Sequence, residues 1–103
     1  MSLTIKKTTE KNILIRGTEF ELNEVYGRLQ FVSRENGLTL EIAVGIYLNQ
    51  DAYLQHKFLL TDIPSHLEYL NVNLGEDEKQ SLETAHKYAK LAYEQLGYEV
   101  IIN

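Results

Sequence analysis

The three histidines are the side chains best suited to acid–base catalysis or metal binding, and their spacing favours neither. His56, His66 and His86 lie ten and twenty residues apart, so no two share the i, i+4 spacing of a zinc-binding helix. No H-E-x-x-H motif surrounds them. We therefore expect no metal site. His56 and His66 are interpreted as solvated loop residues, and His86 as a residue at the edge of a buried helix stripe.

Other nucleophile and phosphate-binding motifs are missing from the sequence. No serine lies in a G-x-S-x-G context, and the glycines form neither a G-x-G-x-x-G fingerprint nor a P-loop. The chain has no cysteine, which excludes disulfides, thiolate zinc sites and cysteine nucleophiles. We therefore expect no catalytic residue and no cofactor.

The carboxylates are numerous but their positions favour structural roles. The acidic run 76–78 suits the start of a helix, where the dipole is positive. Glu19 and Glu21 share one face of an expected strand, where they are suited to cation binding or acid–base work. Because Asp and Glu usually stay exposed, a solvated strand face is the favoured interpretation. A small enzyme whose carboxylate and histidine site assembles only in the folded chain is our third functional hypothesis.

Tyrosine is the unusual residue type, with seven copies in 103 residues. Tyr26 and Tyr47 are expected to face each other across a hairpin, close to Arg28 and Val32. Aromatic residues and arginine are enriched at interface hot spots. We take Tyr26, Arg28, Val32 and Tyr47 as a candidate partner surface. The alternative is a cross-strand pair that only stabilises the sheet.

A long β-hairpin is expected from Val25 to Leu48. An Asn-Gly pair at 36–37, flanked by apolar alternation, predicts a two-residue type I′ turn in which Glu35 pairs with Leu38. This register gathers the apolar residues on one face; on the other it pairs Tyr26 with Tyr47, Arg28 with Gly45, and Val32 with Glu41. Such a hairpin needs further strands and a cover.

Shorter elements are expected on both sides of this hairpin. The pattern predicts strands at 3–7, 57–60 and 98–102, and an edge strand or extended loop at 66–74. Residues 49–53 have the chemistry of a turn and helix start. A second hairpin is expected from 12–16 and 18–22 around Gly17, with Ile13, Ile15, Phe20 and Leu22 inward.

The C-terminal helix is expected to begin at 75–77 and to end at Gly97. Its apolar stripe consists of Leu82, Ala85, Ala89, Ala92, Tyr93 and Leu96. Leu91 lies opposite this stripe and Tyr88 to one side. A lone exposed leucine is normal; the alternative is that the two mark a helix face that packs on a neighbouring subunit. Together these elements predict an α+β fold, an antiparallel sheet of about five strands with one long helix packed on one face.

Length and charge set further limits. The 103 residues form a single domain, 1–103, and the 44% hydrophobic and 24% charged content is typical of a folded globular protein. Fifteen acidic residues against ten basic ones give a net charge of −5, which disfavours nucleic acid as a partner. There is no signal-peptide pattern and no apolar run long enough for a bilayer, so we expect a cytoplasmic protein with no membrane contact.

The layout resembles that of small uncharacterised proteins encoded by bacteriophages or prophages. The resemblance covers the Asn-Gly hairpin, the Asp-Ala-Tyr loop, the Asp-Ile-Pro break and the Leu-Gly-Tyr-Glu-Val helix end. It implies a virion structural or accessory role, and a virion-associated location if the chain is phage-encoded. Our first hypothesis is therefore a non-enzymatic interaction or assembly protein that binds a protein partner or forms a homo-oligomer. The alternative is a monomeric acidic protein that binds or inhibits a host protein.

Overall fold

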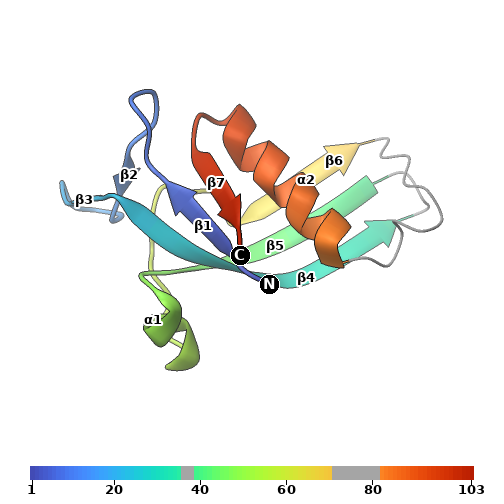
Figure 1. Cartoon of the computed structure of the whole chain (residues 1–103), viewed down its shortest axis with the longest axis horizontal. Helices are drawn as coiled ribbons and strands as arrows, with labels where there is room; N and C mark the ends of the chain where they lie inside the picture. The colour runs from blue at the N-terminus through green and yellow to red at the C-terminus, as the bar shows by residue number, and fades with distance from the viewer. Residues whose placement is uncertain (36–38, 71–81) are drawn as a thin grey trace.

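One curled antiparallel sheet, covered by one long helix, forms the body of the molecule (Figure 1). The computed structural model describes residues 1–35, 39–70 and 82–103. Five strands pair in the order β6-β5-β4-β1-β7, and every pairing is antiparallel. The helix α2 (Leu82–Gln95) crosses the concave face. The expected α+β fold is confirmed.

The long hairpin consists of β4 (Glu24–Glu35) and β5 (Thr39–Tyr47). Its register is as expected from Tyr26 opposite Tyr47 to Leu29 opposite Val44, and then it shifts by one residue. Gln30 is the extra residue of this β-bulge, which leaves it without a partner across the ladder. The expected pairing of Glu35 with Leu38 is therefore wrong, because Glu35 pairs with Thr39. The Asn-Gly turn itself lies outside the described residues.

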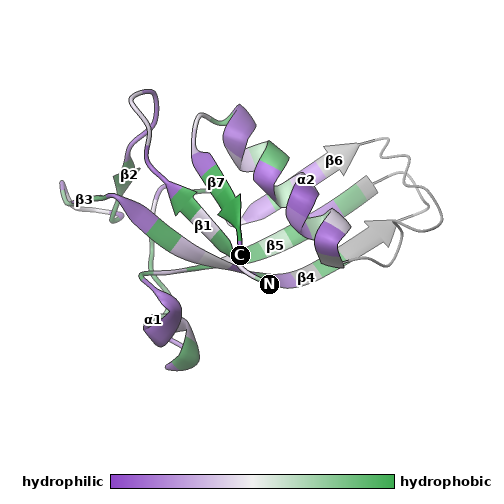
Figure 2. Cartoon of the chain, viewed as in Figure 1, coloured by the Kyte–Doolittle hydropathy of each residue, from purple (hydrophilic) through white to green (hydrophobic). Residues whose placement is uncertain are grey.

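The hydrophobic core lies between the concave face of the sheet and α2. Its largest fully buried side chains are Tyr93, Leu3, Ile5, Ile13, Ile42, Val25 and Val44. Burial of each such residue contributes roughly 1.5 to 3 kcal/mol. Figure 2 shows the hydrophobic residues of β1 (Leu3–Lys6) and β7 (Glu99–Ile102) beside the helix. Ala85 and Ala89 are also buried, and their small side chains let the helix approach the sheet closely.

The end of α2 is the glycine-capped end expected from the sequence. Gly97 has a φ of +106°, its N–H donates to the Glu94 carbonyl at 3.0 Å, and the Tyr98 N–H donates to the Tyr93 carbonyl at 3.1 Å. These two bonds form a Schellman motif. The expectation that Leu96 belongs to the core is wrong: it follows the last helical residue and is 45% exposed. The expected helix start at 75–77 and the side chain of Leu82 lie outside the described residues.

The second hairpin is smaller than expected. It pairs β2 (Ile13–Leu14) with β3 (Glu21–Leu22), and Gly17 has the positive φ, +79°, that its turn requires. Ile13 is fully buried, as expected. The inward position expected for Phe20 is wrong, because Phe20 precedes the paired residues of this short hairpin and is 71% exposed.

The segment between β5 and the edge strand β6 contains one short helix. α1 (Gln50–Leu54) starts at Asn49, whose Oδ1 accepts a hydrogen bond from the Ala52 N–H at 2.9 Å. The strand expected at 57–60 is not formed, and Leu59 and Leu60 instead link β5 to the small hairpin by single backbone bonds. β6 (His66–Leu70) pairs with β5, so the edge strand is the correct alternative up to residue 70. Residues 71–74 lie outside the described part of the chain.

Candidate functional site

An aromatic cluster joins α1 to the convex face of the hairpin. It consists of Tyr26, Tyr47, Tyr53 and Phe58. The Tyr53 ring, from α1, lies 5.8 Å from the Tyr26 ring and 5.2 Å from the Tyr47 ring, centroid to centroid. Phe58 stacks on Tyr47 at 5.0 Å with an interplanar angle of 26°. The cross-strand tyrosine pair is thus the platform on which α1 and the loop after it are fixed.

Gly45 makes room for this arrangement. It lies two residues from Tyr47 on the same strand face, so the Tyr47 ring extends over it. A Cβ at position 45 would lie 3.0 Å from both Tyr47 Cε2 and Gln30 Nε2. The glycine is therefore required by the close approach of the tyrosine ring and the bulged glutamine.

The sequence-predicted partner surface is brought together only in part. Tyr26, Arg28 and Tyr47 lie on one face, as the register required. Val32 does not lie with them, because the bulge places it opposite Ile42, a core residue, instead of Glu41. Tyr47 is only 4% exposed, so α1 and Phe58 cover most of the residue. Tyr26 and Arg28 remain half-buried at the margin.

Arg28 is held by two of its neighbours. Its guanidinium carbon lies 4.5 Å from the centroid of the Tyr53 ring, a cation–π contact. Its Nη1 also donates to the Tyr26 hydroxyl at 3.5 Å. The hydrogen bond to the Tyr26 hydroxyl is the main cause that raises the pKa of Arg28 above its ordinary value. The side chain is a permanent, oriented positive charge beside the cluster.

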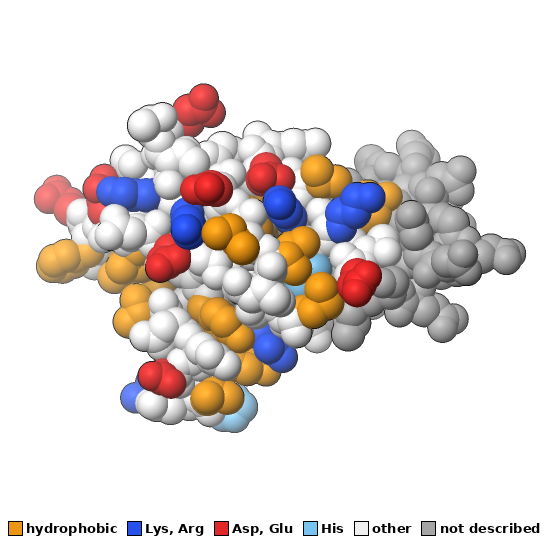
Figure 3. All heavy atoms as spheres, viewed as in Figure 1, with side chains coloured by type: hydrophobic (Ala, Val, Ile, Leu, Met, Phe, Trp, Pro, Cys, Tyr) orange, Lys and Arg blue, Asp and Glu red, His pale blue; other side chains and the backbone are white. Residues whose placement is uncertain are grey.

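Three exposed hydrophobic side chains lie on and after α1. Leu54 is 63%, Phe58 61% and Leu60 65% exposed. We call these three residues the apolar ridge; Figure 3 shows hydrophobic side chains at the surface around α1, at the bottom of the view. Sequence reasoning missed the ridge because it interpreted 57–60 as a strand. The available signal was the apolar run Phe58-Leu59-Leu60 directly before a proline-containing break.

A hollow of about 230 Å³ opens beside the apolar ridge. The hollow lies between two points at which the chain is bonded to β5. At the first, the Leu59 N–H donates to the Ile46 carbonyl, and at the second, the Val44 N–H donates to the Ser65 carbonyl. Phe58 and Leu60 line it together with Arg16 and Gln30. Its shape suits one apolar side chain of a partner, with polar donors at the rim.

One group of histidine and carboxylate side chains lies close together among the described residues. Glu41, His66 and Glu68 place one ligand atom each within 4.8 Å of one another on the convex face. Exposed groups of this kind are common without a metal ion, so the cluster alone does not define a site. His66 lies on strand β6 and not in the expected loop, although it is exposed.

The remaining titratable groups have structural positions. His56 is exposed, as expected, whereas His86 is 3% exposed and belongs to the buried side of α2 rather than its edge. Glu19 is exposed, and Glu21 forms a surface ion pair with Lys7 at 4.0 Å. The Tyr93 hydroxyl, which is buried, donates to the Pro64 carbonyl at 2.6 Å, and burial raises its pKa.

Comparisons with protein-family models, curated proteins and solved structures gave no match. Within the described ranges, no helix is long and apolar enough to cross a membrane. The site is therefore interpreted from its own geometry.

Proposed function

We propose that this chain is a non-enzymatic protein–protein interaction or assembly protein, and that the apolar ridge is its contact surface. The observation that carries the proposal is Phe58: its ring is 61% exposed yet stacked at 5.0 Å on the buried Tyr47. An aromatic side chain that is already ordered loses little conformational entropy on binding. Exposed, rigid aromatic groups next to an arginine are typical of interface hot spots.

The surroundings of the ridge support the same role. Leu54 and Leu60 extend the apolar surface on either side of Phe58 in the chain, and the adjacent hollow offers a place for a partner's side chain. A partner surface with an apolar centre and polar rim would complement this arrangement. The expected homo-oligomer, including a subunit of a phage particle, is one form of this proposal.

A monomeric binding protein is the second form. The net charge of −5 favours a partner with a basic surface around the contact and disfavours nucleic acid. Both forms use the ridge, so one set of variants tests them together.

The test compares Phe58→Ser with Leu91→Ser. Leu91, on α2, is 42% exposed and is the matched control for loss of a surface hydrophobic residue. Molar mass is measured by light scattering over a wide concentration range; if the wild type stays at 11.9 kDa, binding is measured to peptides selected from a random library. We expect Phe58→Ser to lose the association and Leu91→Ser to keep it. A wild type that neither self-associates nor selects any peptide, or a Phe58→Ser variant that associates normally, would overturn the proposal.

A further inference from the structure

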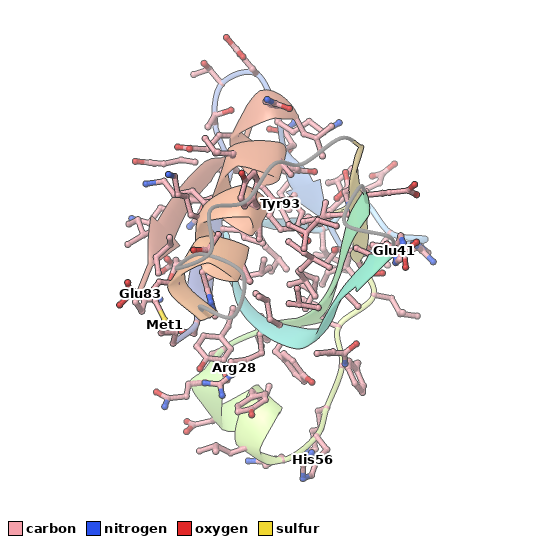
Figure 4. The ribbon with its side chains drawn as sticks, turned by 90° about the vertical axis from the view of Figure 1, so that its right-hand side faces the viewer. Met1, Arg28, Glu41, His56, Glu83 and Tyr93 are labelled. Atoms are coloured by element: carbon pink, nitrogen blue, oxygen red, sulfur yellow. The ribbon has the colours of Figure 1, made fainter. Side chains whose placement is uncertain are left out.

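A second hollow, of about 470 Å³, lies at the other margin of the aromatic cluster. Arg28 and Tyr26 of β4 line it together with Gln50 of α1. The remaining described lining comes from the two ends of the chain and includes Ser2, Thr4 and Asn103. Figure 4 shows Arg28 in the space between Met1 and α1.

Arg28 supplies the one charged side chain among the described residues that line this hollow. The stacking on Tyr53 and the hydrogen bond to Tyr26 fix the plane of its guanidinium before any ligand arrives. These contacts with Tyr26 and Tyr53 use only part of a group that has five N–H donors. The guanidinium therefore keeps donors for an acceptor in the hollow.

The opposite wall adds neutral donors. Asn103 Nδ2 donates to Thr4 Oγ1 at 2.8 Å and to Ser2 Oγ at 3.2 Å. Because both hydroxyls accept at these contacts, each keeps its own hydrogen to donate. With the Gln50 amide, the hollow presents several neutral donors beside the Arg28 guanidinium.

Acidic side chains are missing from the described lining, which is notable in an acidic chain. The sequence has fifteen acidic residues, yet no Asp or Glu is among the described residues that line the hollow. The nearest acidic group on β4, Glu24, lines a separate hollow that shares Tyr26, Thr4 and Gln50 with this one. The Arg28 hollow is thus a local positive site on a negatively charged protein.

We propose that this hollow binds the carboxylate of an Asp or Glu side chain on the partner protein, with the Arg28 guanidinium as its principal donor. The inference rests on the proposed function and adds the chemistry of the partner. A planar guanidinium matches the two oxygens of a carboxylate. The guanidinium charge can balance one carboxylate charge, whereas the net charge of −5 disfavours a phosphorylated or polyanionic ligand.

The hollow and the apolar ridge are linked through the cluster. Tyr53 contacts both Arg28 and Tyr47, and Tyr47 stacks on Phe58. The matching partner segment therefore carries a carboxylate near an apolar side chain, the first for Arg28 and the second for the ridge.

The test is selection of a random peptide library on the full immobilised chain, followed by binding measurements on individual peptides. We expect the peptides selected by the wild type to be enriched in Asp or Glu beside an apolar residue. Arg28→Gln should weaken their binding by about tenfold or more, since removing one partner of a charge pair is costly. Lys57→Gln, which removes an exposed charge after α1, is the control and should bind within about twofold of the wild type.

A second variation keeps the test valid if Arg28→Gln does not fold. Replacing the peptide's own acidic residue with its amide should weaken binding to the wild type by about tenfold or more. Where Arg28→Gln folds, the two changes together should weaken binding no further than either change alone. Selected peptides without acidic enrichment, or peptides that bind Arg28→Gln as tightly as wild type, would overturn this inference and leave the proposed function standing. Displacement of the peptide by inorganic phosphate but not by acetate, at equal ionic strength, would reassign the hollow to phosphate. Failure to select any peptide, in a chain that is also monomeric, would overturn the proposed function itself.

Discussion

The guanidinium of Arg28 lies 4.5 Å from the centroid of the Tyr53 ring, and this contact fixes α1 against the convex face of the sheet. Arg28 belongs to β4 and Tyr53 to a helix of only five residues, which has little stability of its own. The position of α1, and with it the apolar ridge, therefore depends on the aromatic cluster.

Replacement of Tyr53 tests this dependence. Tyr53→Ala should lower the free energy of unfolding by about 1 to 3 kcal/mol, because a half-buried ring loses its contacts with Tyr26, Tyr47 and Arg28. Amide hydrogen exchange of 50–54 should rise more than that of the sheet. Tyr53→Phe keeps the ring and is the control, with stability close to wild type. Unchanged exchange in Tyr53→Ala would show that α1 is held by other contacts.

Gly17 and Gly97, the two glycines with positive φ in the part of the chain that the structure describes, make a matched pair for urea unfolding. Gly17 has a φ of +79° and open space around an added Cβ, so Gly17→Ala should cost about 1 kcal/mol from backbone strain alone. At Gly97, with a φ of +106°, an added Cβ would also lie 3.3 Å from the Lys11 Cβ. Gly97→Ala should therefore be the more destabilising of the two. The reverse order would contradict the packing of the helix end against Lys11.

The packing at the C-terminal end of α2 can be tested with one buried and one exposed residue. Tyr93→Phe removes the hydrogen bond to the Pro64 carbonyl and should cost about 1 kcal/mol. Leu96→Ala should change stability by no more than about 0.5 kcal/mol, because Leu96 lies at the surface. A cost for Leu96→Ala in the range of a core truncation, about 2 to 5 kcal/mol, would place this residue in the core after all.

Stability at alkaline pH should depend on Tyr98. Burial raises the pKa of the Tyr98 phenol to about 12, and the nearby Asp62 carboxylate adds to the shift. In the unfolded chain a tyrosine loses its proton near pH 10, with a reference pKa of about 10, so above that pH the unfolded state binds fewer protons than the folded state. The contribution of the Tyr98 phenol to the free energy of unfolding is fully present below about pH 10, and it is lost as the pH rises toward the folded-state pKa.

The measurement is the urea midpoint of wild type and of Tyr98→Phe. It is made at neutral pH and again at a pH between the unfolded-state and folded-state pKa values of Tyr98. The Tyr98 hydroxyl has no hydrogen-bond partner among the described residues, so its removal should cost little at neutral pH. Tyr98→Phe should lose less stability than wild type at high pH, with the remaining loss due to the buried Tyr93. An equal loss in both proteins would show that the Tyr98 phenol titrates normally.

The fold was predictable because its signals are local. Apolar alternation along β5 gave its buried face, helical spacing gave Ala85, Ala89 and Tyr93, and Gly97 gave the helix end. The bulge at Gln30 was not predictable in this way, since Ile42 meets an apolar residue of β4 in either register, Phe31 in the expected one and Val32 in the observed one. Only the complete sheet selects between the two registers.

Only the part of the candidate site that follows from the pairing of β4 with β5 was predictable from the sequence. The pairing of Tyr26 with Tyr47 placed both residues beside Arg28. That Tyr47 would be covered was not predictable, because the face on which α1 lies depends on tertiary contacts of Tyr53. The apolar ridge escaped detection for a related reason: the pattern at 57–60 fits a strand, and its exposure follows from the path of the loop.

The most direct test of the apolar ridge is to locate the contact by amide hydrogen exchange. The full chain is measured dilute and free, and then in its associated state, either at high concentration or with a selected peptide. We expect added protection to be centred on residues 50–60, with a smaller effect at Tyr26 and Arg28. Protection centred on the face of α2 that carries Leu91, or on the edge strands β6 and β7, would contradict the account and move the contact surface there.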